Sequence, residues 1–177
     1  MEGLRYLKKD KLILALMAMS LIPALLEQPY TALMPIFAKD IMKVGPQGLG
    51  ILMGAIGFGS IGGALLSATI YRERHKGPLL LGNVIILALF TGFFAFTPWF
   101  IVALPLLFIT GVAQTGYNVL NNTLIQTLSP RHLRGRILGI YFLNHGIMPL
   151  GTLLAGSMAH FMGAPYTVGI LAAIGVI

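Results

Sequence analysis

The stretch from Leu12 to Ala38 constrains the fold of this chain more than any other feature of its sequence. It is apolar along most of its length, it lies between Lys11 and Lys39, and it exceeds the roughly 20 residues that a membrane-spanning helix needs. The rest of the chain has the same character: 56% of all residues are hydrophobic and only 10% are charged, whereas a soluble domain carries roughly 25% charged residues. The sequence therefore predicts an all-α protein that crosses a membrane several times.

Charge clusters and Gly/Pro breaks divide the chain into six hydrophobic segments. Their residues are 12–38, 48–70, 79–97, 100–127, 137–161 and 166–177. Each of the first five is long enough to span a bilayer, whereas the last is short and looks truncated. A cleaved signal peptide is the alternative interpretation of the first segment, because three lysines precede it. Its length and the lack of a small-residue cleavage site favour a retained helix.

The 12 Lys and Arg residues are distributed unevenly between the two sides of the predicted membrane. With alternating spans, one side holds Arg5, Lys8, Lys9, Lys11, Arg72, Arg74, Lys76, Arg131, Arg134 and Arg136, and the other side holds Lys39 and Lys43. Because basic loops stay inside, this asymmetry predicts a multi-pass protein of the cell membrane with a cytoplasmic N-terminus. The formal net charge of +7 is then explained by topology and lipid headgroups, without a nucleic-acid partner.

Cysteine is absent from the chain. Disulfide bonds and thiolate metal sites are therefore excluded. We expect neither a metal site nor a cofactor.

The six segments fall into three types by residue composition, and the order of these types repeats. The first and fourth segments carry polar residues near the middle of the membrane, and the second and fifth carry glycines. The third and sixth are almost uniformly apolar. This order predicts a three-plus-three internal repeat of the type found in many secondary transporters. The glycines that we assign to helix packing are Gly50, Gly54, Gly59, Gly63, Gly151 and Gly156. Such residues let helices approach closely, either as static packing or as a surface on which helices slide.

A polar stripe is predicted on the fourth segment. Thr110, Gln114, Tyr117, Asn118 and Asn121 share one face of a helix, since they fall at i, i+4, i+7, i+8 and i+11. A stripe of this kind must face protein or a water-filled cavity. Lining of a cavity is our first interpretation, and interhelical hydrogen bonding is the alternative.

Glu27 lies near the middle of the first segment, where an ionisable group is costly and usually marks a pathway, a proton relay or a pair. Gln28 and Tyr30 follow it, and Asn144 and His145 lie at a similar depth in the fifth segment. A carboxyl group and an imidazole at that depth could exchange a proton. The alternative is that Glu27 and His145 are neutral and only hydrogen-bonded to neighbours.

Three stretches of the chain resemble a known family. SPRHLRGRILGIY at 129–141 is similar to the loop between helices ten and eleven of major facilitator superfamily exporters. MPLGTLLAG at 148–156 continues the similarity into helix eleven, and PYTALMPIFA at 29–38 resembles helix seven. The branch with the greatest resemblance is the transmembrane secretion effectors, which include the enterobactin exporter and macrolide efflux proteins.

The resemblance implies that the chain is the C-terminal half of a twelve-helix transporter, with the N-terminal half as its partner. It implies ion-coupled alternating access, usually proton antiport for the efflux of a drug or siderophore, so that this chain alone would be inactive. It also implies two cytoplasmic gating loops, whose residues here are Arg72, Arg74, Arg131, Arg134, Gly135 and Arg136. The loop at 71–77 departs from the family's gating motif.

Two other classes of protein are less compatible with the sequence. An intramembrane protease needs a Gly-x-Ser-Gly motif, and the chain has Gly59-Ser60-Ile61-Gly62, in which the serine is misplaced. No HExxH zinc motif and no paired aspartates occur, so the chain is not expected to be an enzyme. A structural or assembly subunit of a larger membrane complex is the main alternative, although such a subunit has no need of a polar stripe.

Overall fold

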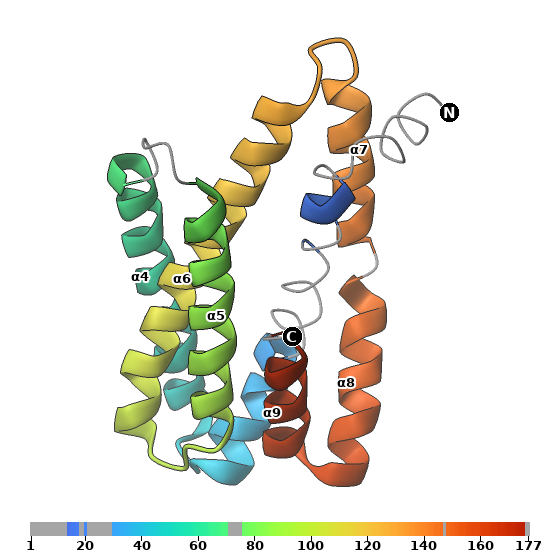
Figure 1. The fold of residues 1–177 in the computed structure, drawn as a ribbon. Helices are drawn as coiled ribbons and strands as arrows, with labels where there is room; N and C mark the ends of the chain where they lie inside the picture. The colour runs from blue at the N-terminus through green and yellow to red at the C-terminus, as the bar shows by residue number, and fades with distance from the viewer. Residues whose placement is uncertain (1–13, 18–19, 21–29, 71–75, 147, 176–177) are drawn as a thin grey trace.

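The computed structural model describes residues 14–17, 20, 30–70, 76–146 and 148–175. Within these ranges the backbone forms helices and the turns that join them, without a strand. The elements with defined ends are the π-helix η1 (Phe37–Ile41) and the α-helices α4 (Gly45–Ile70), α5 (Lys76–Ala95), α6 (Phe100–Leu128), α7 (Arg134–His145), α8 (Met148–Met162) and α9 (Ala164–Ile174). Most of them run up and down along one long axis (Figure 1). The predicted all-α fold is thus confirmed for the described residues.

Three of the described helices, α4, α5 and α6, are long and apolar enough to cross a membrane. Their ends agree to within one turn with the segments predicted at 48–70, 79–97 and 100–127. α6 packs against both α4 and α5. Only 17% of the most apolar part of α4 is buried inside the molecule, so most of its apolar surface is left for lipid or for another protein surface.

The predicted first segment, 12–38, is described only in part. Residues 14–17 and 30–36 are helical, and the second stretch continues directly into η1. η1 begins two residues after Pro35, which has no amide hydrogen and whose ring disturbs a regular α-helix. A π-helical turn is a local irregularity of the kind that follows such a disturbance. Glu27 and Gln28 lie outside the described residues.

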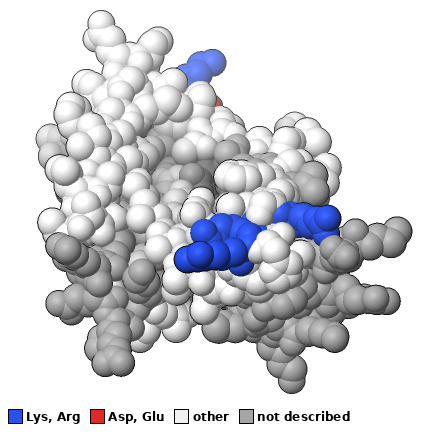
Figure 2. All heavy atoms as spheres, turned by 90° about the horizontal axis from the view of Figure 1, so that it is seen from above, with Lys and Arg blue, Asp and Glu red and all other residues white. Residues whose placement is uncertain are grey.

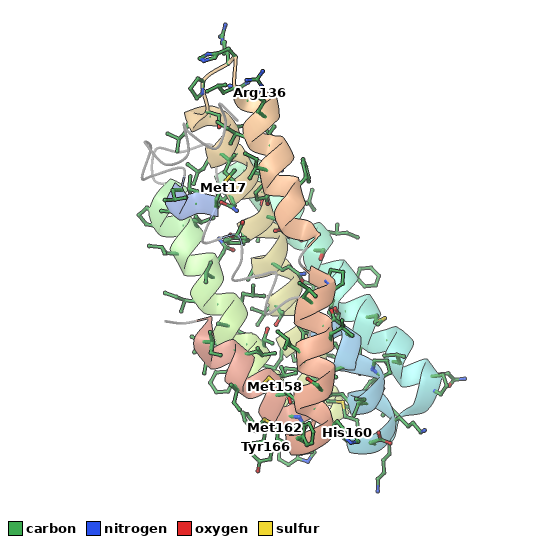
Figure 3. The ribbon with its side chains drawn as sticks, turned by 90° about the vertical axis from the view of Figure 1, so that its right-hand side faces the viewer. Met17, Arg136, Met158, His160, Met162 and Tyr166 are labelled. Atoms are coloured by element: carbon green, nitrogen blue, oxygen red, sulfur yellow. The ribbon has the colours of Figure 1, made fainter. Side chains whose placement is uncertain are left out.

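The predicted fifth segment, 137–161, is divided between two helices. α7 ends at His145, and α8 begins at Met148. In one continuous helix the ring of Pro149 would meet the carbonyl of His145 four residues earlier, and Gly146 has a low helix propensity. The two helices follow one another along the long axis (Figures 1 and 3). The sixth segment, predicted at 166–177, corresponds to the short apolar helix α9.

Buried apolar side chains gather in two clusters, one towards each end of the bundle. The upper cluster consists of Leu16, Met17, Leu80, Val84, Tyr117, Leu120, Ile125, Leu133, Ile137 and Tyr141. The lower cluster consists of Tyr30, Leu33, Met34, Phe37, Ala38, Leu52, Phe94, Ala95, Ala103, Leu107, Ala155, Ala164 and Val168. In Figure 3, Met17 lies towards one end of the molecule and Tyr166 at the other. α7 contributes to the upper cluster and α8 to the lower, so the break between them separates the two.

Candidate functional site

The polar stripe of α6 faces the interior of the bundle. Thr110 and Asn121 are fully buried, Tyr117 and Gln114 are nearly so, and Asn118 is partly buried. Val119, on another face of the same helix, is exposed. Buried polar groups are costly unless they are hydrogen-bonded, so each member of the stripe needs a partner.

Gln114 has its partner on a distant part of the chain. The phenol of Tyr30 donates a hydrogen bond of 3.1 Å to Oε1 of Gln114, which lies 84 residues later in the sequence. Both side chains are buried, Tyr30 completely. This bond ties the helical stretch 30–36 to the middle of α6, and the sequence alone did not predict the pairing.

Most other polar side chains of α6 are satisfied within their own helix. The hydroxyl of Thr110 donates to the carbonyl of Leu106 (2.9 Å), and that of Thr123 donates to the carbonyl of Val119 (2.7 Å). Gln126 donates to the side-chain oxygen of Asn122. Each of these bonds closes within α6 and stabilises that helix.

Among the described side chains of α6, Asn121 is the one whose buried polar atoms lack a partner. Both its Nδ2 and its Oδ1 are buried, and within the described part of the chain neither has a hydrogen-bond partner. Leaving one buried polar group unpaired costs about 1–3 kcal/mol. In native proteins such a group marks a bound water, a ligand or a functional role.

The residues predicted for the proton pathway are only partly described. Asn144 and His145 form the C-terminal end of α7, at the break before α8, and their side chains lie outside the description. Glu27 and Gln28 also lie outside it, as do Arg72 and Arg74 of the first predicted gating loop. The structure therefore does not test a contact between Glu27 and His145.

The second predicted gating loop forms the turn from α6 to α7. The backbone N–H groups of Leu133 and Arg134 both donate to the carbonyl of Pro130, at 3.0 Å, and the side chain of Leu133 is buried in the upper cluster. This anchored turn and the start of α7 carry Arg131, Arg134, Gly135 and Arg136, and Arg side chains gather on this end of the molecule (Figure 2). Arg131 and Arg136 are exposed, whereas Nε of Arg134 is buried and has no partner among the described residues.

The predicted packing glycines fall into two groups. A Cβ on Gly59 or Gly63 would collide with the backbone of α6, and a Cβ on Gly111 of α6 would collide with the backbone of α4. The two helices therefore touch backbone to backbone. Gly111 was missed in the sequence because no second glycine stands four positions before or after it.

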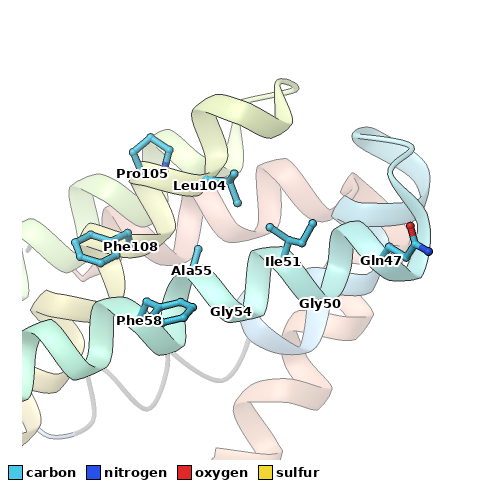
Figure 4. Close-up of a pocket in the computed structure, with 9 residues that line it drawn as sticks. All are labelled: Gln47, Gly50, Ile51, Gly54, Ala55, Phe58, Leu104, Pro105 and Phe108. Carbon is cyan, nitrogen blue, oxygen red and sulfur yellow. The ribbon is translucent and has the colours of Figure 1, made fainter.

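Gly50 and Gly54 form the second group, and nothing lies within 4 Å of where their Cβ atoms would be. They line an open apolar groove of about 890 Å³ between α4 and α6 (Figure 4). The other residues that line it are Gln47, Ile51, Ala55, Phe58, Leu104, Pro105 and Phe108. In the fifth predicted segment, Gly151 is buried, whereas Gly156 is exposed to open space.

Within the ranges that the structure describes, no group of three His, Asp or Glu residues could hold a metal ion. The polar groups assembled at the stripe are amides, hydroxyls and phenols. Such groups bind by hydrogen bonding and carry no reactive nucleophile–base pair of the kind that catalysis requires. A helical bundle with three helices of this length and apolarity belongs to the class of integral membrane proteins.

Comparison with known proteins gives the family. Residues 1–177 match the family model MFS_3, described as transmembrane secretion effector. The chain is 31% identical over 164 residues to the multidrug efflux pump Tap of Mycolicibacterium fortuitum, an overlap of 92% of this chain and 40% of that protein. The multidrug efflux pumps Tap of Mycobacterium tuberculosis and Mycobacterium bovis are 30% identical over 164 residues, which is 92% of this chain and 39% of theirs. No solved structure matches the chain significantly.

The chain belongs to the transmembrane secretion effector family, a family of major facilitator transporters. It is a membrane-embedded protein, as its apolar helices require. It spans about two-fifths of the length of the relatives that it matches.

Proposed function

We propose that this chain forms helices seven to twelve of a transporter that exports a small molecule, such as a drug or a siderophore, by alternating access. Membership of the family and the relatives' names as multidrug efflux pumps support export. The six spans would form a three-plus-three inverted repeat, with both basic loops and the N-terminus in the cytoplasm and the protein in the cell membrane. The unequal distribution of Lys and Arg supports this orientation.

The observation that carries the proposal is the buried polar stripe of α6, tied to the first segment by the bond from Tyr30 to Gln114. In this proposal the stripe lines the substrate pathway when the transporter opens. Glu27, Gln28, Asn144 and His145 complete the pathway and couple it to protons. A structural subunit would not need an unpaired buried amide such as that of Asn121.

The N-terminal half of the transporter is the proposed partner, and the open groove at Gly50 and Gly54 is its proposed contact. The groove is apolar, and its two glycines lie one helical turn apart. No atom lies within 4 Å of the position that a Cβ would take on either glycine. A cysteine placed at Gly54 should be protected from thiol reagents in the full-length protein and accessible in residues 1–177 expressed alone. Equal labelling of this cysteine in the full-length protein and in residues 1–177 alone would contradict contact between the groove and the N-terminal half.

Efflux can be tested in bacterial cells that lack their own drug pumps. Cells expressing the full-length protein should accumulate less ethidium than cells with the empty vector, and a protonophore should abolish the difference. The variant Gln114→Ala should restore accumulation to at least half of the vector level, whereas Gln126→Ala, an exposed change on the same helix, should not. Accumulation that is unaffected by the wild-type protein, for ethidium and for a panel of other drugs, would contradict an efflux function.

A further inference from the structure

The side chain of Asn121 differs from every other polar side chain of α6 whose bonding is described above. Its exposed fraction is 0%, and neither its donor nor its acceptor is used within the described residues. Asn122, the next residue, is partly exposed and accepts a bond from Gln126. The amide oxygen is thus paired at Asn122 and unpaired at its neighbour Asn121.

The neighbours of Asn121 along the buried face of α6 carry no charge. One helical turn before it lies Tyr117 and one turn after it lies Ile125, and both belong to the upper cluster with side chains of α5 and α7. α6 carries no charged residue. Among the described residues the only carboxylate is that of Asp40, which lies in η1, exposed, at the opposite end of the bundle. α6 itself therefore offers no counter-charge to a charged group beside Asn121, and this favours a neutral polar ligand group there.

We propose that the amide of Asn121 is a binding subsite for a hydroxyl or amide group of the transported molecule. A carboxamide offers a donor and an acceptor side by side, and a hydroxyl or another amide can pair with both. The inference rests on the proposed efflux function and deepens it by naming the chemical group that the site selects.

The side chain of Asn121 has an exposed fraction of 0% in the present structure. A ligand can reach Asn121 only when the side chains that cover it move away from α6. Leu16 and Met17 of the first segment and Ile137 and Tyr141 of α7 share that cluster with the neighbours of Asn121. Opening the upper end of the bundle would therefore expose the subsite.

The first experiment needs no ligand and compares two adjacent variants of the full-length protein. Asn121→Leu replaces an unsatisfied amide with an apolar group in an apolar cluster, and the unfolding temperature should rise by about 3 °C or more. Asn122→Leu is the matched control; it removes a satisfied amide, and its unfolding temperature should stay the same or fall. An unchanged or lower value for Asn121→Leu would show that the amide is already satisfied, and the proposal would be overturned.

The second experiment measures selection with two probes in pump-deficient cells. Erythromycin carries several hydroxyl groups, whereas ethidium is an aromatic cation without any. Asn121→Leu should lower the efflux of erythromycin at least tenfold and that of ethidium less than twofold, because a site built to hydrogen-bond a hydroxyl loses most with the ligand that has one. Asn122→Leu should change neither by more than twofold.

Two outcomes of the probe experiment would overturn the subsite. One is erythromycin efflux by Asn121→Leu within twofold of wild type, and the other is an equal loss for both probes. If the wild-type protein exports neither probe, the efflux function is contradicted for these molecules. The unfolding comparison then tests by itself whether the amide of Asn121 is unsatisfied.

Discussion

The bond between Tyr30 and Gln114 joins two parts of the chain that are distant in sequence, and both of its side chains are buried. In an apolar bundle such a bond fixes the register of one helix against another, because each partner alone would leave a polar group unsatisfied. Neither residue reveals this role in the sequence. Tyrosine before an apolar run is common, and the partner of Gln114 depends on how the helices pack.

A double-mutant cycle can measure this bond. Tyr30→Phe leaves Oε1 of Gln114 without its donor, so the free energy of unfolding should fall by about 1–3 kcal/mol. Tyr30→Phe combined with Gln114→Leu should cost less than the sum of the two single changes, because it removes both partners. Tyr166→Phe, at an exposed phenol, serves as the control. Strictly additive effects would mean that the two side chains do not interact.

Glu27 is the residue at which proton coupling can be tested most directly. Glu27→Gln keeps the shape and much of the hydrogen bonding but cannot titrate. If Glu27 carries protons, the variant should lose uphill efflux driven by a pH gradient and should retain exchange of substrate down its own gradient. Transport into proteoliposomes measures both activities.

The matched control is Asp40→Asn, the same change at an exposed carboxylate of η1. It should keep both activities. Unchanged uphill efflux by Glu27→Gln between about pH 6 and 8 would reduce Glu27 to a hydrogen-bonding group.

Among the elements, α4, α5 and α6 could be predicted because each is a long apolar run with charged or Gly/Pro-containing sequence at its ends. The break between α7 and α8 was missed, since the stretch 137–161 contains no Lys, Arg, Asp or Glu and its length is right for a span. The break depends on one steric conflict, between Pro149 and the carbonyl of His145. The polar stripe was also predicted from spacing, but its division into satisfied and unsatisfied members required the packed structure.

Gly111 allows a test of the contact between α4 and α6. In Gly111→Ala the new methyl group would collide with the backbone of Ile56, and the free energy of unfolding should fall by about 1–3 kcal/mol. Gly82→Ala, on α5, has open space at the same atom and should be neutral or slightly stabilising. Thermal unfolding of both variants measures the difference. Equal effects would mean that α4 can move aside.

At the scale of the whole molecule, the absence of cysteine makes the topology directly testable. Single cysteines at His75 and Pro130 should react with a membrane-impermeant thiol reagent only after the cells are opened, because both loops are predicted to be cytoplasmic. A cysteine at Lys43, in the turn before α4, should react in intact cells. Labelling of position 75 or 130 from outside would reverse the orientation.

The backbone contact between α4 and α6 has a mechanical consequence. Helices separated by layers of flexible side chains can slide or tilt against each other, but two helices in direct backbone contact have no soft layer between them. α4 and α6 should therefore move together as one rigid pair of helices. The open groove between α4 and α6 and the polar stripe of α6 both lie on this helix pair. A protein surface pressing on the groove would thus displace the stripe as well, with no chain of intermediate side chains needed to carry the movement.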